Sequence, residues 1–381
     1  MKSFITVIRI LVAVLFIFSG LVKANDPVGL SYKMQEFFTV WGMSSFNSAA
    51  LVFSVIMIAL EIIAGVALLI GWYAKWVTWF LLLLIIFFTF LTGYAWLSGQ
   101  FKACGCFGDC IPIKSNQSFY KDVILLTLII ALLLGKRYIT PTASPKVNWV
   151  LMISTIILSI LIQIYTIDHL PIKDCLSFKV GNNILEKRKY KSDSVVITYT
   201  YNKAGKAYKV TPPNYPTWML EGDTTYIIDT ASTVTKVIRE GNKLDLIRDF
   251  TMTSISGTDS LESILNQKGK MVLLIITNAS ALAKANNDIL KLKEQCMLYT
   301  DTAMLAIPNS KPPLYIITNQ VADVTTYLKT SMPNLSNSHI FFCDEKPLLA
   351  AARTRPAIMV VSDGTILQKL SYHDFDKVAL K

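Results

Sequence analysis

The sequence is poor in charge, in histidine and in the usual redox motif. Only 17% of its 381 residues are charged and 52% are hydrophobic, which is unusual for a chain that is soluble along its whole length. A closed zinc site needs four cysteine or histidine ligands. The three histidines, His169, His339 and His373, are far in sequence from the clustered cysteines, so no metal is predicted. The six cysteines contain no Cys-x-x-Cys spacing.

The formal net charge of +11 does not indicate nucleic-acid binding. The Lys and Arg residues are scattered, and the sequence lacks the basic helix or aromatic and basic stripe that follows phosphates. An excess of cations in loops beside a membrane explains the balance better. We therefore expect membrane lipid as a partner, and no nucleic acid.

The apolar residues are concentrated in the first part of the chain. A helix needs about 20 apolar residues to cross the hydrocarbon of a bilayer. Five runs approach that length: Phe4–Val22, Ala49–Trp72, Trp76–Leu97, Phe119–Leu134 and Val147–Ile167. The first run could instead be a signal peptide cleaved near Val22-Lys23-Ala24. Its length and the interruption by Arg9 favour a retained helix, so the sequence predicts five membrane spans.

The short loops predict the orientation of these spans. If the N-terminus is cytoplasmic, the inner loops contain cations and no acid, namely Lys2, Lys75, Lys136, Arg137 and Lys146. The outer loops mix both signs, and Lys23 is counted among their cations. Because cytoplasmic loops are enriched in Lys and Arg, we expect a bacterial inner-membrane protein whose chain after Asp168 lies in the periplasm. The cysteine-rich loop then lies on the same oxidising side.

Glu61 lies in the second apolar run, within MIALEIIAGVALLIGWY. It is the one ionisable side chain that we assign to the interior of a span. A carboxylate in hydrocarbon costs several kcal/mol unless it is neutral, paired or in contact with water. Glu61 is therefore a candidate for handling a proton within the bundle, or else a protonated group that packs against a neighbouring helix. The small residues Ala64, Gly65 and Ala67 would allow close helix contact.

The stretch KACGCFGDCIP, residues 102–112, contains Cys104, Cys106 and Cys110. In a structural interpretation, Cys106 and Cys110 bridge a tight turn, while Cys104 pairs with Cys175 and pins the loop to the exported part. In a redox interpretation, one disulfide and one attacking sulfur exchange with each other, and a Cys104–Cys106 bond would close a small ring. Lys102 would favour a thiolate, whereas Asp109 would oppose one at Cys110. Both interpretations remain open at this stage.

The remainder of the chain has two predicted parts. Residues 171–245 contain an alternating β pattern at Val195–Tyr201 followed by a Lys-Ala-Gly-Lys turn, and we expect a β-rich connector there. In residues 246–381, apolar strands alternate with helical segments such as Ser280–Tyr299, which indicates an α/β sheet. The expected strands are Met271–Thr277, Ala303–Ile307, Leu314–Ile317, His339–Phe342 and Ala357–Val361.

Three ordered motifs in residues 1–170 carry a family resemblance: LFIFSGLVKANDPVG, ALEIIAGVALLIG and CGCFGDC. The first part of the chain resembles the DoxX family, and its cysteine loop is similar to that of MauE, the membrane protein of methylamine utilisation. This resemblance implies a four-helix membrane bundle, here with a fifth span, and a link to thiol or quinone chemistry. Many DoxX proteins lack the cysteines, so membership alone does not establish an activity.

The last part of the chain resembles thioredoxin-like proteins in DFTMTSISG and in ARTRPAIMVVSDGTILQKL. The resemblance places Pro356 at the cis-proline of that fold, a substrate-facing turn. It also places Asn278-Ala279-Ser280-Ala281-Leu282 where an active member has Cys-x-x-Cys. Cys296 and Cys343 are distant from that point, and a core or structural role is favoured for both.

These observations predict an α-helical membrane bundle (1–170), a β-rich connector (171–245) and a degenerate thioredoxin-like domain (246–381). The favoured function is periplasmic thiol–disulfide or quinone-linked electron transfer, with Cys104, Cys106, Cys110 and Glu61 as the reacting groups and a quinone as the candidate cofactor. Asp109, Cys175 and Pro356 are predicted to be structural or partner-facing. The alternative is a non-catalytic membrane scaffold whose thioredoxin-like domain binds a periplasmic or membrane protein, and whose cysteines form structural disulfides.

Overall fold

The computed structural model describes residues 2–99, 108, 110–111, 113–189, 194–212, 214, 216–220, 225–239, 247, 249–254, 257–298, 311–335 and 338–380. The chain packs as two compact units. One unit combines Met1–Ile184 with Arg248–Lys381, and the other is Leu185–Ile247. The first unit is therefore discontinuous in sequence, and the second is inserted into it.

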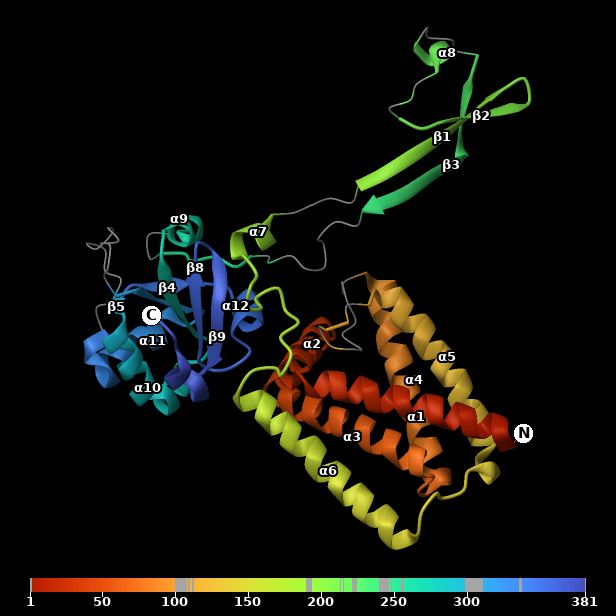
Figure 1. Ribbon diagram of the computed structural model, residues 1–381, viewed down its shortest axis with the longest axis horizontal. Helices are drawn as coiled ribbons and strands as arrows, with labels where there is room; N and C mark the ends of the chain where they lie inside the picture. Colours follow the sequence, from red (N-terminus) through yellow and green to blue (C-terminus); the bar gives the residue numbers. More distant parts are fainter. Residues whose placement is uncertain are drawn as a thin grey trace. The chain divides into compact units, whose positions relative to one another are not determined.

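Five long apolar helices form the first part of the chain (Figure 1). They are α1 (Lys2–Ala24), α3 (Ala50–Ile70), α4 (Ala74–Ser98), α5 (Ser115–Leu134) and α6 (Pro145–Asp168). Within the described residues, these helices are long and apolar enough to cross a membrane, and each covers one of the five predicted runs. The prediction of five spans is confirmed, and the protein is a membrane protein.

A shorter helix, α2 (Pro27–Val40), and the 3-10 helix η1 (Ser44–Ala49) fill the connection between α1 and α3. Asp26 caps α2, because its Oδ1 accepts a hydrogen bond of 2.8 Å from the Gly29 N–H, and Pro27 begins the helix where no N–H donor is needed. The sequence predicts only a loop for this segment. At 14 residues, α2 is too short to register as a span.

The contact between α1 and α3 depends on glycine. A Cβ atom on Gly65 would lie 3.0 Å from the backbone nitrogen of Ile17, and one on Gly20 would lie 2.5 Å from Cγ1 of Ile62. Ala64 and Ala67 are also buried. The two helices therefore approach closely through small residues, as predicted for Gly65 and its neighbours.

The inserted unit is a three-stranded antiparallel sheet of order β2-β1-β3, formed by β1 (Ser194–Lys203), β2 (Lys206–Val210) and β3 (Ile227–Arg239). Ala204 and Gly205 both have positive φ, which is the geometry of a tight two-residue hairpin turn. The predicted hairpin around the Lys-Ala-Gly-Lys turn is confirmed. The short helices α7 (Ile184–Arg188) and α8 (Thr217–Leu220) accompany it.

The last part of the chain is an α/β domain whose sheet has the order β5-β6-β4-β8-β9, with β7 also paired to β6. The strands are β4 (Lys270–Ile276), β5 (Met297–Leu298), β6 (Pro313–Thr318), β7 (Ile340–Phe342), β8 (Ala357–Ser362) and β9 (Thr365–Ser371). β4 pairs with β6 in parallel and with β8 in antiparallel orientation, and β8 and β9 form a hairpin. This is the expected thioredoxin-like arrangement. The predicted strand Ala303–Ile307 lies outside the described residues.

The helices of this domain are α9 (Leu261–Leu265), α10 (Leu282–Gln295), α11 (Val321–Ser331) and α12 (Glu345–Ala352), with the 3-10 helices η3 (Ala279–Ala281), η4 (Pro333–Leu335) and η5 (Tyr372–Lys377). The predicted helix Ser280–Tyr299 is too long. The backbone becomes extended at Cys296, and β5 then pairs with β6. Pairing of β5 with β6 and burial of Cys296 thus end α10 at Gln295, although the helical pattern in the sequence had been expected to continue to Tyr299.

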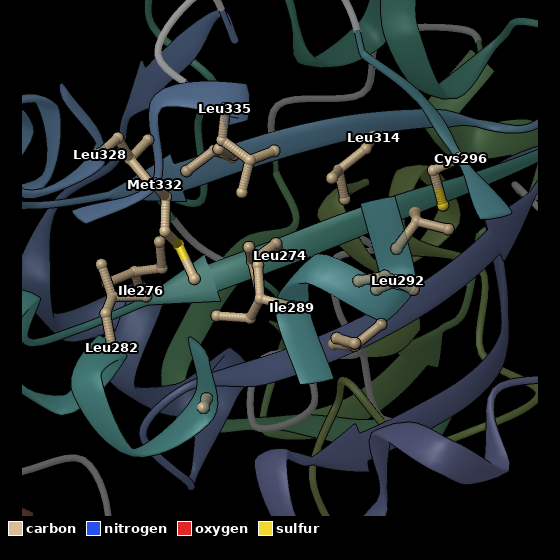
Figure 2. Close-up of a cluster of buried hydrophobic side chains, with 14 of the residues drawn as sticks. Leu274, Ile276, Leu282, Ile289, Leu292, Cys296, Leu314, Leu328, Met332 and Leu335 are labelled. Atoms are coloured by element: carbon tan, nitrogen blue, oxygen red, sulfur yellow. The ribbon is translucent and has the colours of Figure 1, made fainter. Parts of the chain in front are cut away.

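The core of the α/β domain forms between the sheet and α10 and α11 (Figure 2). Leu282, Ile289 and Leu292 of α10 lie against Leu274 and Ile276 of β4. All but the first residue of β4 are buried. A strand covered on both faces has a continuous apolar run instead of alternation, which explains why Met271–Thr277 was recognisable in the sequence.

Candidate functional site

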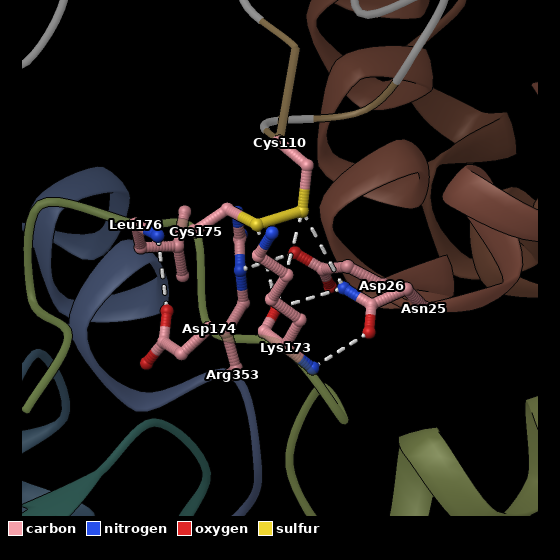
Figure 3. Close-up of a disulfide and its surroundings, with 8 residues drawn as sticks. All are labelled: Asn25, Asp26, Cys110, Lys173, Asp174, Cys175, Leu176 and Arg353. Atoms are coloured by element: carbon pink, nitrogen blue, oxygen red, sulfur yellow. Dashed lines mark hydrogen bonds and ion pairs between the residues drawn. A yellow bond between two sulfur atoms is a disulfide. The ribbon is translucent and has the colours of Figure 1, made fainter.

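A disulfide joins Cys110, which follows α4, to Cys175, which follows α6 (Figure 3). The two Cα atoms are 4.8 Å apart and the bridge closes a sequence separation of 65 residues. Both cysteines are half-buried. The predicted pairing of Cys106 with Cys110, and of Cys104 with Cys175, is therefore wrong. Cys175 pairs with Cys110 because the segment after α6, which carries Cys175, is held directly beside Cys110.

Asn25, at the end of α1, holds the segment that carries Cys175. Its Nδ2 donates to the carbonyl of Lys173 and its Oδ1 accepts from the Lys173 N–H, both at 2.9 Å. The same Nδ2 lies 3.7 Å from Sγ of Cys110. One side chain thus contacts one sulfur of the disulfide and fixes the backbone two residues before the other (Figure 3).

A buried ion pair lies next to this disulfide. Arg353, which follows α12, contacts Asp26 with 2.9 Å between Nε and Oδ2, and the side chains are only 6% and 11% exposed. The guanidinium group also lies 5.4 Å from the centre of the Tyr32 ring. Two charges removed from water need this kind of mutual compensation. The α/β domain is therefore fastened to the start of α2.

A second ion pair fastens the sheet to the segment after α6. Lys369 of β9 is 1% exposed and contacts Asp174 at 3.0 Å. Burial lowers the pKa of Lys369, while the neighbouring Asp174 carboxylate opposes that shift. Ser371 also donates a hydrogen bond of 2.9 Å to the carbonyl of Asp168. These contacts surround the disulfide with charge and hydrogen bonds that join the two parts of the unit.

Cys104, Cys106 and Asp109 are outside the described residues. Pro356 is buried, and the Arg355–Pro356 peptide bond is cis, as the thioredoxin resemblance implied. The turn that carries Pro356 includes Arg353, so part of this turn contacts the helical bundle.

Cys296 and Cys343 are buried thiols in the α/β domain. Burial raises the pKa of Cys296 to about 12 and that of Cys343 to about 11. A thiol attacks disulfides and metals as its thiolate, so both groups are unreactive near neutral pH. This agrees with the core role favoured from the sequence.

Glu61 of α3 forms an ion pair with Lys23 of α1, and the two side chains are 1% and 3% exposed. Ser19 donates to the other carboxylate oxygen of Glu61 at 3.2 Å. The ammonium group of Lys23 also lies 4.6 Å from the centre of the Phe88 ring. The expectation that Lys23 belongs to an outer loop is wrong, because Lys23 lies in the last turn of α1 and faces inward.

Asp122 of α5 is a second buried carboxylate that sequence reasoning missed. It is 1% exposed, its Oδ1 lies 2.7 Å from Nζ of Lys121, and its Oδ2 accepts a hydrogen bond of 3.0 Å from Thr92. Arg9 of α1 is buried as well and donates to the carbonyl of Thr140 at 3.1 Å. The statement that Glu61 is the one ionisable side chain within a span is therefore wrong. The high mean hydropathy of the first and fourth apolar runs obscured the charged residues Arg9 and Asp122 within them.

Together these features define a class: a membrane protein whose helical bundle is fastened by buried ion pairs to a thioredoxin-like α/β domain, with a disulfide beside them that joins the segments after α4 and α6. Comparison with known proteins gives a more specific likeness. Residues 1–135 match the family model of Methylamine utilisation protein MauE. The Protein TlpB of Flavobacterium psychrophilum is 26% identical over 213 residues, which is 52% of this chain and 56% of that protein. The chain thus spans just over half the length of this relative, and no solved structure matches.

Proposed function

We propose that this protein carries out thiol–disulfide exchange at the periplasmic side of a bacterial inner membrane, through Cys104 and Cys106. The observation that carries the proposal is the disulfide between Cys110 and Cys175. It anchors the cysteine loop at the junction of the bundle and the α/β domain. The match of residues 1–135 to the MauE model, together with the DoxX-like motifs, supports a role in thiol or quinone chemistry.

The distribution of cysteines supports Cys104 and Cys106 as the exchanging pair. Of the six cysteines, two are joined in the disulfide. Cys296 and Cys343 are buried and their pKa values are raised, which disfavours the reactive thiolate. Cys104 and Cys106 remain, six and four residues, respectively, before the anchored Cys110 in the sequence. The proposed reacting cysteines are therefore Cys104 and Cys106, whereas the sequence had suggested Cys110 as well.

The proposed chemistry is a two-electron exchange. A thiolate of a periplasmic protein dithiol attacks one sulfur of a Cys104–Cys106 disulfide, and that S–S bond breaks as a mixed disulfide forms. The second substrate thiolate resolves the mixed disulfide, so the substrate becomes a disulfide and Cys104 and Cys106 become thiols. Re-forming the Cys104–Cys106 disulfide from the two thiols releases two electrons and two protons, which a membrane quinone would accept as the oxidant.

A second candidate function is a membrane scaffold in which every disulfide is structural. The surroundings of the Cys110–Cys175 bond favour it. Asn25 hydrogen-bonds to both backbone groups of Lys173, and two ion pairs with buried cations lie near this bond. A bridge embedded in such contacts stabilises the docked arrangement, and in this role the α/β domain would bind a protein partner without exchanging thiols.

Thiol trapping in intact cells distinguishes the two functions. Cells expressing the protein are quenched in acid, alkylated and analysed with and without reductant. In the exchange model, the Cys104→Ser or Cys106→Ser variant accumulates a mixed disulfide with a periplasmic protein, and the wild-type loop is partly reduced when quinone is depleted. The matched control is Cys343→Ser, which is expected to trap nothing.

The opposite result supports the scaffold. In that case, Cys104 and Cys106 remain fully oxidised with and without quinone, no partner is trapped by either variant, and the Cys→Ser substitutions lower only the thermal stability. Such an outcome would exclude electron transfer through the loop.

A further inference from the structure

A small cavity lies within the helical bundle, separate from the disulfide, and polar side chains interrupt a wall that is otherwise apolar. Four of the spanning helices contribute to it, with Ser19 and Lys23 from α1, Glu61 from α3, Phe88 from α4, and Lys121 and Asp122 from α5. Its volume is about 30 Å³, which holds about two water molecules. A quinone ring or lipid head group is larger than that. The cavity is therefore suited to water and to the groups that water can protonate.

Two buried carboxylates line this cavity, Glu61 from α3 and Asp122 from α5. Glu61 is paired with Lys23 and accepts a hydrogen bond from Ser19. Asp122 is paired with Lys121 and accepts one from Thr92. An isolated charge in this environment is costly, yet each carboxylate has a cation and a hydroxyl donor. The four charged groups that line the cavity sum to zero net charge.

The positive charge of Lys23 has neighbours other than Glu61 that can stabilise it. If Glu61 takes up a proton, Lys23 loses its carboxylate partner. The face of Phe88 remains 4.6 Å away, where an aromatic ring attracts an ammonium group, and Asp122 lines the same cavity. The site can therefore hold Glu61 in either protonation state without leaving the lysine charge uncompensated.

One wall of the cavity reaches the surface of the bundle. The side chain of Lys121 is 27% exposed, while its partner Asp122 is 1% exposed. Lys121 and Asp122 thus lie between the bundle surface and the cavity that Glu61 also lines. The other described charged side chain on the cavity wall is Lys23, and α4 contributes the uncharged Phe88.

We propose that this cavity is a proton-binding site in which Glu61 and Asp122 exchange a proton through enclosed water while Lys23 supplies the compensating charge. The step is a proton transfer alone: the O–H bond of a protonated Asp122 carboxyl group breaks as its proton passes to an enclosed water molecule, that water gives up another proton, an O–H bond forms at the Glu61 carboxylate, and no electron moves. This inference goes beyond the proposed thiol exchange and does not depend on it.

Infrared spectroscopy of the full-length protein in lipid nanodiscs tests the proposal. In a pH titration, the difference between the wild-type and Glu61→Gln spectra should contain one protonated-carboxyl band that grows on acidification, because both proteins share the absorption of the other carboxyl groups. The matched control is Glu36→Gln, which alters a half-exposed carboxylate of α2 paired with Lys33. Lys23→Met should move the appearance of the band to higher pH, because Glu61 loses its cation.

Asp122→Asn should move the same band to lower pH, because a negative charge is removed from the cavity wall and the ionised form of Glu61 is then favoured. A shift caused by Asp122→Asn requires the two carboxylates to be coupled across the cavity, which a Lys23–Glu61 pair isolated from Asp122 would not show. The proposal is overturned if the wild type has no band that depends on Glu61, or if Lys23→Met and Asp122→Asn leave its pH dependence unchanged. Should Glu61→Gln fail to fold, the double variant Lys23→Met/Glu61→Gln, which leaves no buried charge unpaired, replaces it.

Discussion

The side-chain amide of Asn25 bonds to both backbone groups of Lys173, with its Nδ2 and Oδ1 each 2.9 Å from their partners. Asn25 ends the first spanning helix, whereas Lys173 follows the last. These two hydrogen bonds hold the C-terminal end of α1 next to the segment after α6, and so place Cys175 beside Cys110. The disulfide therefore forms between segments that the Asn25 hydrogen bonds also hold together.

Asn25→Ala is predicted to make the Cys110–Cys175 disulfide easier to reduce. Each lost hydrogen bond is worth about 1 kcal/mol, so the two together correspond to roughly a tenfold to thirtyfold shift in the reduction equilibrium. The measurement is the oxidised fraction after equilibration with graded reductant, followed by alkylation and mass spectrometry. Asn116→Ala, which removes a local contact to Gln117, serves as control. An unchanged reduction curve would exclude a role for Asn25 in holding the bond.

Breaking the ion pair between Asp26 and Arg353 is predicted to loosen the α/β domain from the bundle. Arg353→Met or Asp26→Asn should cost about 3–5 kcal/mol, because each leaves one buried charge without its partner. Asn at position 26 retains an acceptor for the Gly29 N–H, so helix capping is preserved. The measurement is thermal unfolding together with limited proteolysis after Asp168.

The double variant Asp26→Asn/Arg353→Met should cost much less than the sum of the single variants. Lys33→Met provides the control, because the Lys33–Glu36 pair is about one-third exposed and such pairs contribute about 1 kcal/mol or less. Strictly additive losses in the double variant would contradict the pairing described for Asp26 and Arg353.

Mass spectrometry of the non-reduced protein should yield a cross-linked peptide that contains Cys110 and Cys175. Cys175→Ser removes a bridge across 65 residues, and in the chain-entropy model a closed loop of this length stabilises the folded state by at most about 4 kcal/mol. Thermal unfolding of the variant should therefore occur at a lower temperature. A peptide joining Cys106 to Cys110 would contradict this connectivity.

The buried thiols predict a loss of stability in alkali. Burial raises the pKa of Cys296 from 9.0 to about 12, and that of Cys343 from 9.0 to about 11. The protonated thiols therefore favour the folded state fully below the ordinary thiol pKa, and this contribution is lost as the pH rises from about 9 toward 11 and 12. Cys296→Ala and Cys343→Ala should flatten the alkaline part of the stability curve, measured by denaturant unfolding at each pH. Alkylation of either thiol in the folded protein at neutral pH would contradict their burial.

The spans were predictable from sequence because hydropathy and length are local properties. The same holds for β4, whose continuous apolar run reflects burial on both faces. By contrast, the partner of Glu61 was not predictable. Lys23 lies at the boundary of its apolar run, and only the close packing of α1 on α3 through Gly20 and Gly65 brings it to Glu61.

The disulfide connectivity was not predictable either. Three cysteines within seven residues allow several pairings with Cys175, and local spacing favoured a bridge between Cys106 and Cys110. The actual choice of Cys110 depends on where Asn25 holds the backbone of Lys173, a contact between residues far apart in the chain. Asp122 differs from these cases, because it lies within a predicted span and a residue-by-residue check of that span would have found it.

The contact between Asp26 and Arg353 also constrains the order of events during synthesis. Asp26 is synthesised long before Arg353. Until Arg353 has been made, the Asp26 carboxylate has no guanidinium partner and has to stay hydrated. Docking of the α/β domain through this ion pair therefore follows the synthesis of Arg353, and a nascent chain stalled before residue 353 would expose a surface that the finished protein hides.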